Sequence, residues 1–332
     1  MFRSRSLLLL TICFMMAGLL GRTAAAGTYR LIFASYFGPS HPNTKAMESF
    51  KEKLEKASNG AFRITLKPNN EAGGEEKIME LVKRGTLQVA LVGGLIKDDE
   101  PMIGGWEQPF IVDGWEHARK VFIGGEFADK FAGKYTEKTG VRIKGLVVNG
   151  FRQISCNFAI TTMDDFRRMK IRTPLSDTFI QIFKGLGTNP TPMPMTELYT
   201  AMETKVVDGQ DNPYSTVVSM GWWEVQPYML ESRHVFSPTS VLVNGKFEDG
   251  LPEDMRKLFN DTLAETISLA WDLAEKDEGE SVKFLKDKNI VIHIPDNNFK
   301  QQMRDAMKDP YAWFDANVPG AKAIRDYCAS KR

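Results

Sequence analysis

The chain has 332 residues, a formal net charge of +1 at pH 7 and only three cysteines. A charge this close to neutral, with no basic patch, argues against a nucleic-acid partner. So few cysteines exclude a disulfide framework, and the four histidines lie far apart, outside any H-x-x-x-H or C-x-x-C pattern. We therefore expect no metal site and no cofactor.

The first 26 residues have the pattern of a secretory signal peptide. Arg3 and Arg5 form a positively charged N-terminal region, and residues 7–20 are an apolar run that is shorter than a typical transmembrane helix. The small residues 24–26 supply a cleavage site. This segment holds three arginines and no acid, so its removal changes the net charge from +1 to −2. The pattern predicts export of the mature chain.

The mature chain, 332 residues less 26, is long enough for two domains of about 150 residues each. No second apolar run of membrane length is present, so we expect no stable membrane insertion of the mature chain. Cys156 and Cys328 both remain after processing. One bridge between them is compatible with an oxidising compartment, and the sequence leaves their pairing open.

Strand and helix patterns alternate in the first part of the mature chain. Residues 29–36 and 62–68 favour strands, and residues 89–93 favour a short buried strand. Pro42 opens a helix whose apolar residues recur every three or four positions, and Glu75 lies in the acidic first turn of a second helix. Such alternation predicts an α/β fold with a parallel sheet.

Residues 141–157 form a long extended run that is interrupted at Asn149 and Gly150, where glycine permits a bend. A strand of this length can cross between two domains. Beyond the bend the side chains alternate between the two faces of the predicted strand. The guanidinium of Arg152 is therefore expected to lie on a strand.

The C-terminal half continues the α/β pattern. Residues 235–243 favour a strand, and Pro252 starts a very long helix that reaches at least Leu273, long enough to span two lobes. A separate helix around Phe284, a strand at residues 290–294 and a helical tail are expected to follow.

The segment from Met169 to Pro213 carries the strongest indication of a binding site. Lys170 and Arg172 share one face of a short strand that ends at Pro174. A guanidinium on a rigid strand, followed by turns with polar side chains, suits recognition of a small anion. Taken alone, Arg172 is equally compatible with an ordinary surface arginine.

Four motifs occur in order along the chain: N-G-F-R-Q at residues 149–153, M-K-I-R-T-P at 169–174, P-M-P-M-T-E-L-Y at 192–199 and V-D-G-Q-D-N-P at 207–213. The chain therefore resembles the substrate-binding proteins of TRAP transporters, of the dicarboxylate-binding (DctP) type, over nearly all its mature length. The resemblance implies a periplasmic receptor, not an enzyme, that closes around an organic acid. It further implies delivery to the small and large subunits of a membrane permease driven by an ion gradient.

The resemblance also implies an architecture and a range of ligands. The fold would be a two-lobed α/β periplasmic binding protein with hinge strands and a long helix spanning both lobes. We expect a C4-dicarboxylate, a sugar acid or a 2-oxo acid as ligand. The signal peptide would cover residues 1–26, lobe I residues 27–149 plus 237–276, and lobe II residues 150–236 plus 277–332.

Three binding residues follow from matching positions in these motifs. Arg172 matches the family's arginine that holds the ligand carboxylate in a two-pronged salt bridge, and Arg152 matches its second pocket arginine. Asn212 matches the asparagine that hydrogen-bonds the carboxylate end. Elementary chemistry agrees, because a planar fork of donors fits two carboxylate oxygens and an amide can donate to one of them.

Further pocket residues are expected at the rim. Met195, Tyr36 and Glu75 match positions near the ligand, although each also has a structural interpretation: core filler, a hydroxyl directed to solvent, and a favourable charge at a helix start. Tyr214 and Trp106 are candidates for aromatic walls around a bulkier acid, or for structural roles.

Two alternatives to a TRAP receptor stay open at this point. A receptor for an ABC importer has the same two-lobed architecture. Neighbouring genes that encode two membrane subunits and no ATPase would argue against this alternative. A secreted enzyme acting on small acids would need a nucleophile beside a base or two matched carboxyls. Asp208 and Asp211 are the nearest to such a pair, but acids in turns of this kind usually bond to the local backbone.

Overall fold

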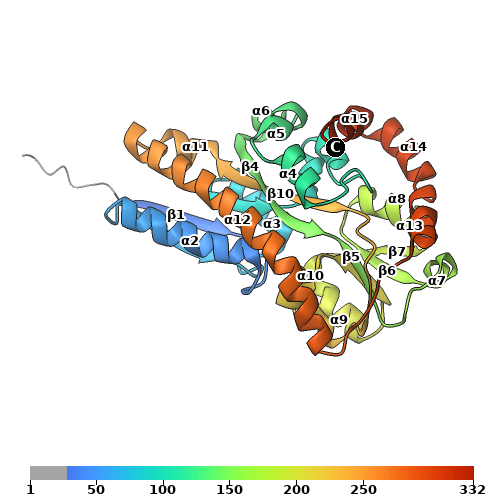
Figure 1. The fold of residues 1–332 in the computed structure, drawn as a ribbon. Coiled ribbons are helices and arrows are strands. Elements are labelled where there is room, and N and C mark those ends of the chain that lie inside the picture. The colour runs from blue at the N-terminus through green and yellow to red at the C-terminus, as the bar shows by residue number, and fades with distance from the viewer. Residues whose placement is uncertain (1–27) are drawn as a thin grey trace, which may run out of the picture.

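The computed structural model describes residues 28–332, so the predicted signal peptide lies outside the described residues. Two β-sheets with helices around them form two lobes (Figure 1). The first sheet has the order β2 (Phe62–Lys67), β1 (Tyr29–Ala34), β3 (Val89–Val92), β10 (Phe236–Asn244) and β4 (Val141–Phe151). The second has the order β11 (Val291–His293), β9 (Tyr228–Leu230), β5 (Gln153–Cys156), β8 (Gly209–Asn212), β6 (Lys170–Thr173) and β7 (Asn189–Pro192).

Helices fill the connections between these strands. Within residues 28–332 none of them is both long and apolar enough to cross a membrane. The α-helices are α2 (Pro42–Ala57), α3 (Glu75–Lys83), α4 (Trp115–Phe122), α5 (Glu126–Phe131), α6 (Tyr135–Thr139), α7 (Met163–Arg167), α8 (Asp177–Gly185), α9 (Leu198–Glu203), α10 (Tyr214–Ser219), α11 (Gly245–Asp249), α12 (Glu253–Asp287), α13 (Asn297–Asp305), α14 (Lys308–Asn317) and α15 (Ala321–Ser330). Short 3₁₀ helices are η1 (Gly94–Asp98), η2 (Pro101–Gly105), η3 (Met195–Glu197) and η4 (Trp222–Glu224).

The first sheet is mixed, which corrects the expectation of a parallel sheet. Strand β1 pairs in parallel with β2 and β3, as alternating strands and helices predict. Strand β10, however, is antiparallel to both β3 and β4. The reason is the path of the chain, because β10 enters the first sheet from the second lobe and so runs against its neighbours.

The predicted crossing strand is confirmed. Strand β4 ends at Phe151 in the first sheet, and the chain continues from Gln153 as β5 in the second sheet. Arg152, predicted to lie on a strand, is instead the single residue between the two strands, because the chain changes sheets there. Gly150 adopts φ 121°, a conformation that side chains disfavour, so the bend requires glycine at this position. The Arg152 amide donates to the carbonyl of Val235 over 2.8 Å, which ties the two crossing segments together.

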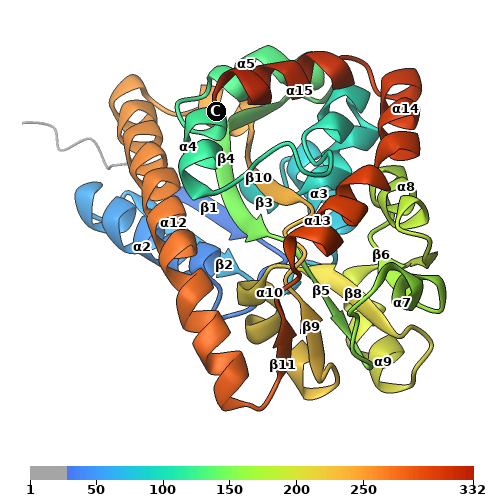
Figure 2. The same ribbon diagram turned by 45° about the vertical axis from the view of Figure 1, so that its right-hand side comes forward.

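Helix α12 extends along both lobes, packing against α2 at one end and α10 at the other (Figure 2). Its 35 residues include Phe284, so the expectation of a separate helix there is wrong. The last turns remain helical because Leu285 is buried and Lys283 pairs with Asp287 one turn later. A glycine inside the helix, Gly279, lowers helix propensity but does not break it.

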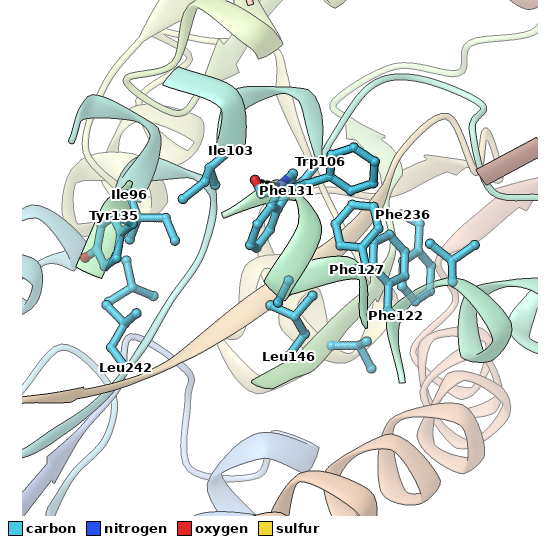
Figure 3. Packing of buried hydrophobic residues seen from close by; sticks show 14 of the residues in the cluster. Ile96, Ile103, Trp106, Phe122, Phe127, Phe131, Tyr135, Leu146, Phe236 and Leu242 are labelled. Carbon is cyan, nitrogen blue, oxygen red and sulfur yellow. Dashed lines mark hydrogen bonds between the residues drawn. The ribbon is translucent and has the colours of Figure 1, made fainter. Parts of the chain in front are cut away.

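The core beside the first sheet is strongly aromatic (Figure 3). Trp106 lies within it, and its indole N–H donates to the carbonyl of Phe131 over 3.0 Å. Ile324 and Tyr327 of α15 pack into the same core, so this helix reaches the first lobe although the predicted division assigns residues 277–332 to lobe II. The lobe boundaries otherwise stay a prediction.

The two mature cysteines lie in different hydrophobic clusters. Cys156 packs in the core of the second lobe, whereas Cys328 packs beside the first sheet. Both are free and buried. Burial raises the pKa of each thiol to about 12, which keeps both protonated at neutral pH.

Candidate binding site

A cavity opens where the two lobes meet, with about 590 Å³ of empty space including its opening to solvent. Its walls come from loops and strand ends of both sheets and from the crossing strand. Six of the seven binding residues predicted from the sequence line it: Arg172, Arg152, Asn212, Met195, Tyr36 and Glu75. Tertiary structure thus gathers side chains that are spread over 177 positions of the chain, from 36 to 212.

Arg172 extends from β6 and is only 4% exposed. Its Nε and Nη2 donate to the carbonyl oxygen of Met193 over 3.1 and 2.9 Å, which fixes the plane of the guanidinium. Among residues 28–332 no carboxylate lies within ion-pair distance of it, and burial lowers its pKa to about 10. A buried cation without an acidic partner is costly, so this position favours a bound anion.

Arg152 is equally buried but already neutralised by the protein. Its Nε lies 2.5 Å from Oδ2 of Asp211, and its Nη2 donates to the Asp211 carbonyl over 2.5 Å. Although burial acts to lower the pKa of Arg152, Asp211 raises it above its ordinary value. Burial acts to raise the pKa of Asp211, but Arg152 and a hydrogen bond with His234 hold it well below its usual range.

Asn212 follows directly after the acid of this pair, on β8 beside β5. Its Nδ2 donates to Oε1 of Gln210 over 2.8 Å, and one N–H of the amide is left for another acceptor. Met195 begins the 3₁₀ helix η3 and forms part of the apolar wall.

The first lobe contributes acids to the cavity. Oε1 of Glu75, at the start of α3, accepts a hydrogen bond from the Gly93 amide at 2.5 Å, while burial raises its pKa to about 8. Glu107 accepts a hydrogen bond from the hydroxyl of Ser237, and burial raises its pKa as well. Tyr36 lies beside them, with its hydroxyl 3.4 Å from Oγ1 of Thr239.

Backbone without side chains lets these acids approach the strand end. A Cβ added at Gly93 would lie 3.0 Å from Oε1 of Glu75 and 3.3 Å from the hydroxyl of Tyr36. A Cβ at Gly94 would clash with the carboxylate of Glu107. Both glycines therefore provide the space that the acids occupy.

Tyr214 does not line the cavity. It is buried in a core cluster of the second lobe, and its hydroxyl donates to Oε2 of Glu231 over 3.1 Å. Trp106, the other candidate for an aromatic wall, belongs to the core of the first lobe (Figure 3). Among the described residues the aromatic rings at the cavity are those of Tyr36 and Phe179, and the Phe179 ring lies 4.6 Å from the guanidinium carbon of Arg152.

Sequence reasoning missed several cavity residues. Glu107 lies in a region with a weak helical pattern, and nothing in its spacing distinguishes it from a surface acid. Asn149 stands in the N-G-F-R-Q motif but was interpretable only as part of the bend. Asp211, expected to bond to its own turn, instead neutralises Arg152 across two strands.

Two α/β lobes joined by crossing strands, with a charged cavity between them, define the class of extracellular solute-binding proteins. The chain belongs to one family within that class, bacterial extracellular solute-binding protein family 7 (DctP), whose model matches residues 33–317.

Individual relatives agree with this membership. An uncharacterized protein of Haemophilus influenzae is 34% identical over 290 residues, which cover 87% of this chain and 88% of that protein. The C4-dicarboxylate-binding periplasmic protein DctP of Rhodobacter capsulatus is 30% identical over 260 residues, which cover 77% of each chain.

Solved structures have the same architecture. A TRAP periplasmic solute-binding protein from Haemophilus influenzae with bound L-gulonate is 32% identical, with a TM-score of 0.86, and the match covers 91% of this chain and 99% of that one. The sugar acid binding protein DctPAm from Advenella mimigardefordensis, in complex with galactonate, is 27% identical with a TM-score of 0.88, covering 92% and 99%. The two-lobed fold expected from the sequence is confirmed.

Proposed function

We propose that this protein binds the carboxylate of a small organic acid in the cavity between its lobes, with Arg172 as the principal anchor. One observation carries the proposal: Arg172 is buried at the cavity, held by the Met193 carbonyl, and has no carboxylate partner among the described residues. Its remaining N–H groups match the two oxygens of a ligand carboxylate. Such an anion would remove the cost of the unpaired charge.

The neighbouring polar groups complete the carboxylate site in this proposal. Asn212 lines the same cavity and donates the free N–H of its amide to a ligand oxygen. Arg152 contributes to ligand binding mainly through its position, because its charge is already neutralised by the ion pair with Asp211. The ligand enters while the lobes are apart, and their closure about the Gly150 bend then excludes water and strengthens these hydrogen bonds.

Export and delivery complete the proposed role. The N-terminal pattern directs the chain out of the cytoplasm, the signal peptide is cleaved, and the mature receptor works in the periplasm. It passes its ligand to the small and large membrane subunits of a TRAP permease without chemical change. Relatives with bound L-gulonate and galactonate support an organic acid as the ligand.

Calorimetric titration of the mature protein tests the proposal. Organic acids of the classes bound by relatives should bind, and the amide of a bound acid should bind at least about 100-fold more weakly, because it lacks the negative charge that Arg172 compensates. The acid should be recovered unchanged after prolonged incubation. Equal affinity for acid and amide would overturn the carboxylate site, and conversion of the acid would indicate an enzyme.

A further inference from the structure

The charged groups of the cavity are separated by lobe. Arg172 comes from the second sheet and Arg152 from the junction between the sheets, whereas the acids Glu75, Glu76 and Glu107 come from helices and loops of the first lobe. A ligand between the lobes therefore meets a cationic wall at one end and an acidic wall at the other.

Of the cations that the described part of the chain places at the cavity, one is available to a ligand. The charge of Arg152 is compensated by Asp211, with Nε 2.5 Å from Oδ2. Arg172 has carbonyl acceptors only, so it is the lining cation that retains a full positive charge for an anion. One uncompensated guanidinium suits one ligand carboxylate.

The acidic wall has the chemistry of a hydroxyl-binding surface. One oxygen of Glu75 accepts from the Gly93 amide and one oxygen of Glu107 accepts from the Ser237 hydroxyl. Within residues 28–332 the structure gives the Oε2 atom of each acid no hydrogen-bond donor. Carboxyl oxygens of this kind accept hydrogen bonds from ligand hydroxyls. Above a pH of about 8, where Glu75 is ionised, they also disfavour a second ligand carboxylate by like charge.

We propose that the cavity selects a polyhydroxylated monocarboxylate over a dicarboxylate, with the ligand carboxylate on Arg172 and its hydroxyls on Glu75 and Glu107. This inference rests on the proposed function and narrows it. It removes the C4-dicarboxylate from the range of ligands that the motifs allow. An unhydroxylated acid is disfavoured as well, because it would leave the oxygens of Glu75 and Glu107 without donors.

Acids matched in length test the selectivity by calorimetry above a pH of about 8, where Glu75 is ionised. D-Erythronate, succinate and butyrate each have four carbons and differ in hydroxyls and in the second carboxylate. L-Gulonate, adipate and hexanoate form the corresponding six-carbon set. Within the set of acids that binds more tightly, the affinity for the hydroxylated monocarboxylate should exceed the affinities for the other two acids by about 100-fold or more. A dicarboxylate or plain acid that binds as tightly overturns the selectivity but leaves the carboxylate receptor standing. Failure of all six acids to bind would contradict both proposals.

Two variants then assign the selectivity to the acidic wall. Glu75→Gln and Glu107→Gln keep the side-chain shape and replace an ionisable carboxyl group by a neutral amide. Each variant should bind the hydroxylated acid about tenfold or more weakly than the parent protein does, because hydrogen bonds to charged groups are stronger than neutral ones. Each should also reduce the ratio of the affinity for the hydroxylated acid to the affinity for the dicarboxylate. Glu80→Gln is the control, since Glu80 is on the same helix as Glu75 but pairs with Lys77 outside the cavity. An unchanged ratio of affinities in both cavity variants would overturn the inference.

Discussion

Nε of Arg152 lies 2.5 Å from Oδ2 of Asp211, whereas the guanidinium of Arg172 hydrogen-bonds, within residues 28–332, to the carbonyl of Met193 alone. Both arginines are buried at the same cavity, yet only one has its charge neutralised by the protein. The pair therefore belongs to the charge balance of the fold itself, while the proposed function assigns the unpaired arginine to a ligand.

Arg172→Ala should nearly abolish ligand binding. Truncating one partner of a buried charge pair typically costs about 2 to 5 kcal/mol, or about 1.5 to 3.5 decades of affinity. Arg172→Lys should also bind poorly, because a compact ammonium cannot reproduce two parallel hydrogen bonds. Calorimetry measures both variants. Arg167→Ala is the control, since Arg167 is exposed and pairs with Asp164 on the surface; parent affinity in either Arg172 variant would refute the anchor.

Removing the same charge should not weaken the ligand-free fold. Arg172→Met keeps the apolar stem but eliminates a buried cation that no acid compensates. We expect the free energy of unfolding to stay equal or to rise by about 1 kcal/mol, because an unpaired buried charge is destabilising. Urea denaturation without ligand measures this. A clear loss of stability would mean that Arg172 serves the fold rather than the ligand.

Arg152→Met should have the opposite effect on stability. It leaves Asp211 buried without its cation, and losses of about 3 to 5 kcal/mol are typical when one partner of a buried pair is removed. The double variant Arg152→Met, Asp211→Asn should recover part of the loss, since it removes the orphaned charge too. Urea denaturation of the two variants gives the comparison, and an equally unstable double variant would contradict this account of the pair.

Ligand-free stability should fall as pH rises from about 5 to 8. The folded state raises the pKa of Glu75 from 4.5 to about 8, so between these values it holds a proton that the unfolded chain releases. The stabilisation from this protonated carboxyl group is complete below the pKa of the unfolded chain and is lost as pH rises through the pKa of the folded state. The free energy of unfolding should fall by at most about 1.4 kcal/mol per pH unit. Glu75→Gln should flatten the profile in urea denaturation, whereas Glu80→Gln should leave it unchanged.

Gly209→Ala should destabilise the second sheet and weaken binding. A Cβ there would lie 2.7 Å from the methyl carbon of Met169 and 3.0 Å from Cα of Cys156, and it would clash with the backbone of Ser155. Overpacking of this kind costs about 1 to 3 kcal/mol and shifts β8 against its neighbours. Gly279→Ala is the matched control, because it faces open space in α12 and should stabilise by up to about 1 kcal/mol. Equal stability of both variants would contradict the close packing inferred here.

Much of the cavity was predictable because its residues lie in short motifs with strong local signals. Arg172, Arg152 and Asn212 each stand on a strand or at its end, where alternation and turn residues fix the side-chain direction. Glu107 was not predictable, since no periodicity marks its segment. Tyr214 was expected at the cavity but faces the core, because the direction of a side chain at a helix start depends on how the helix packs.

The amino-acid sequence by itself determined the alternation of strands and helices, the bend at Gly150 and the position of Arg172 on a strand, because these depend on local periodicity and backbone freedom. Only the tertiary structure decided which charges remain free. Ion pairing depends on distances between segments far apart in the chain, and Arg152 meets an acid 59 positions away while Arg172 meets none among the described residues. That difference, invisible in the motifs, is the reason for proposing Arg172 rather than Arg152 as the ligand anchor.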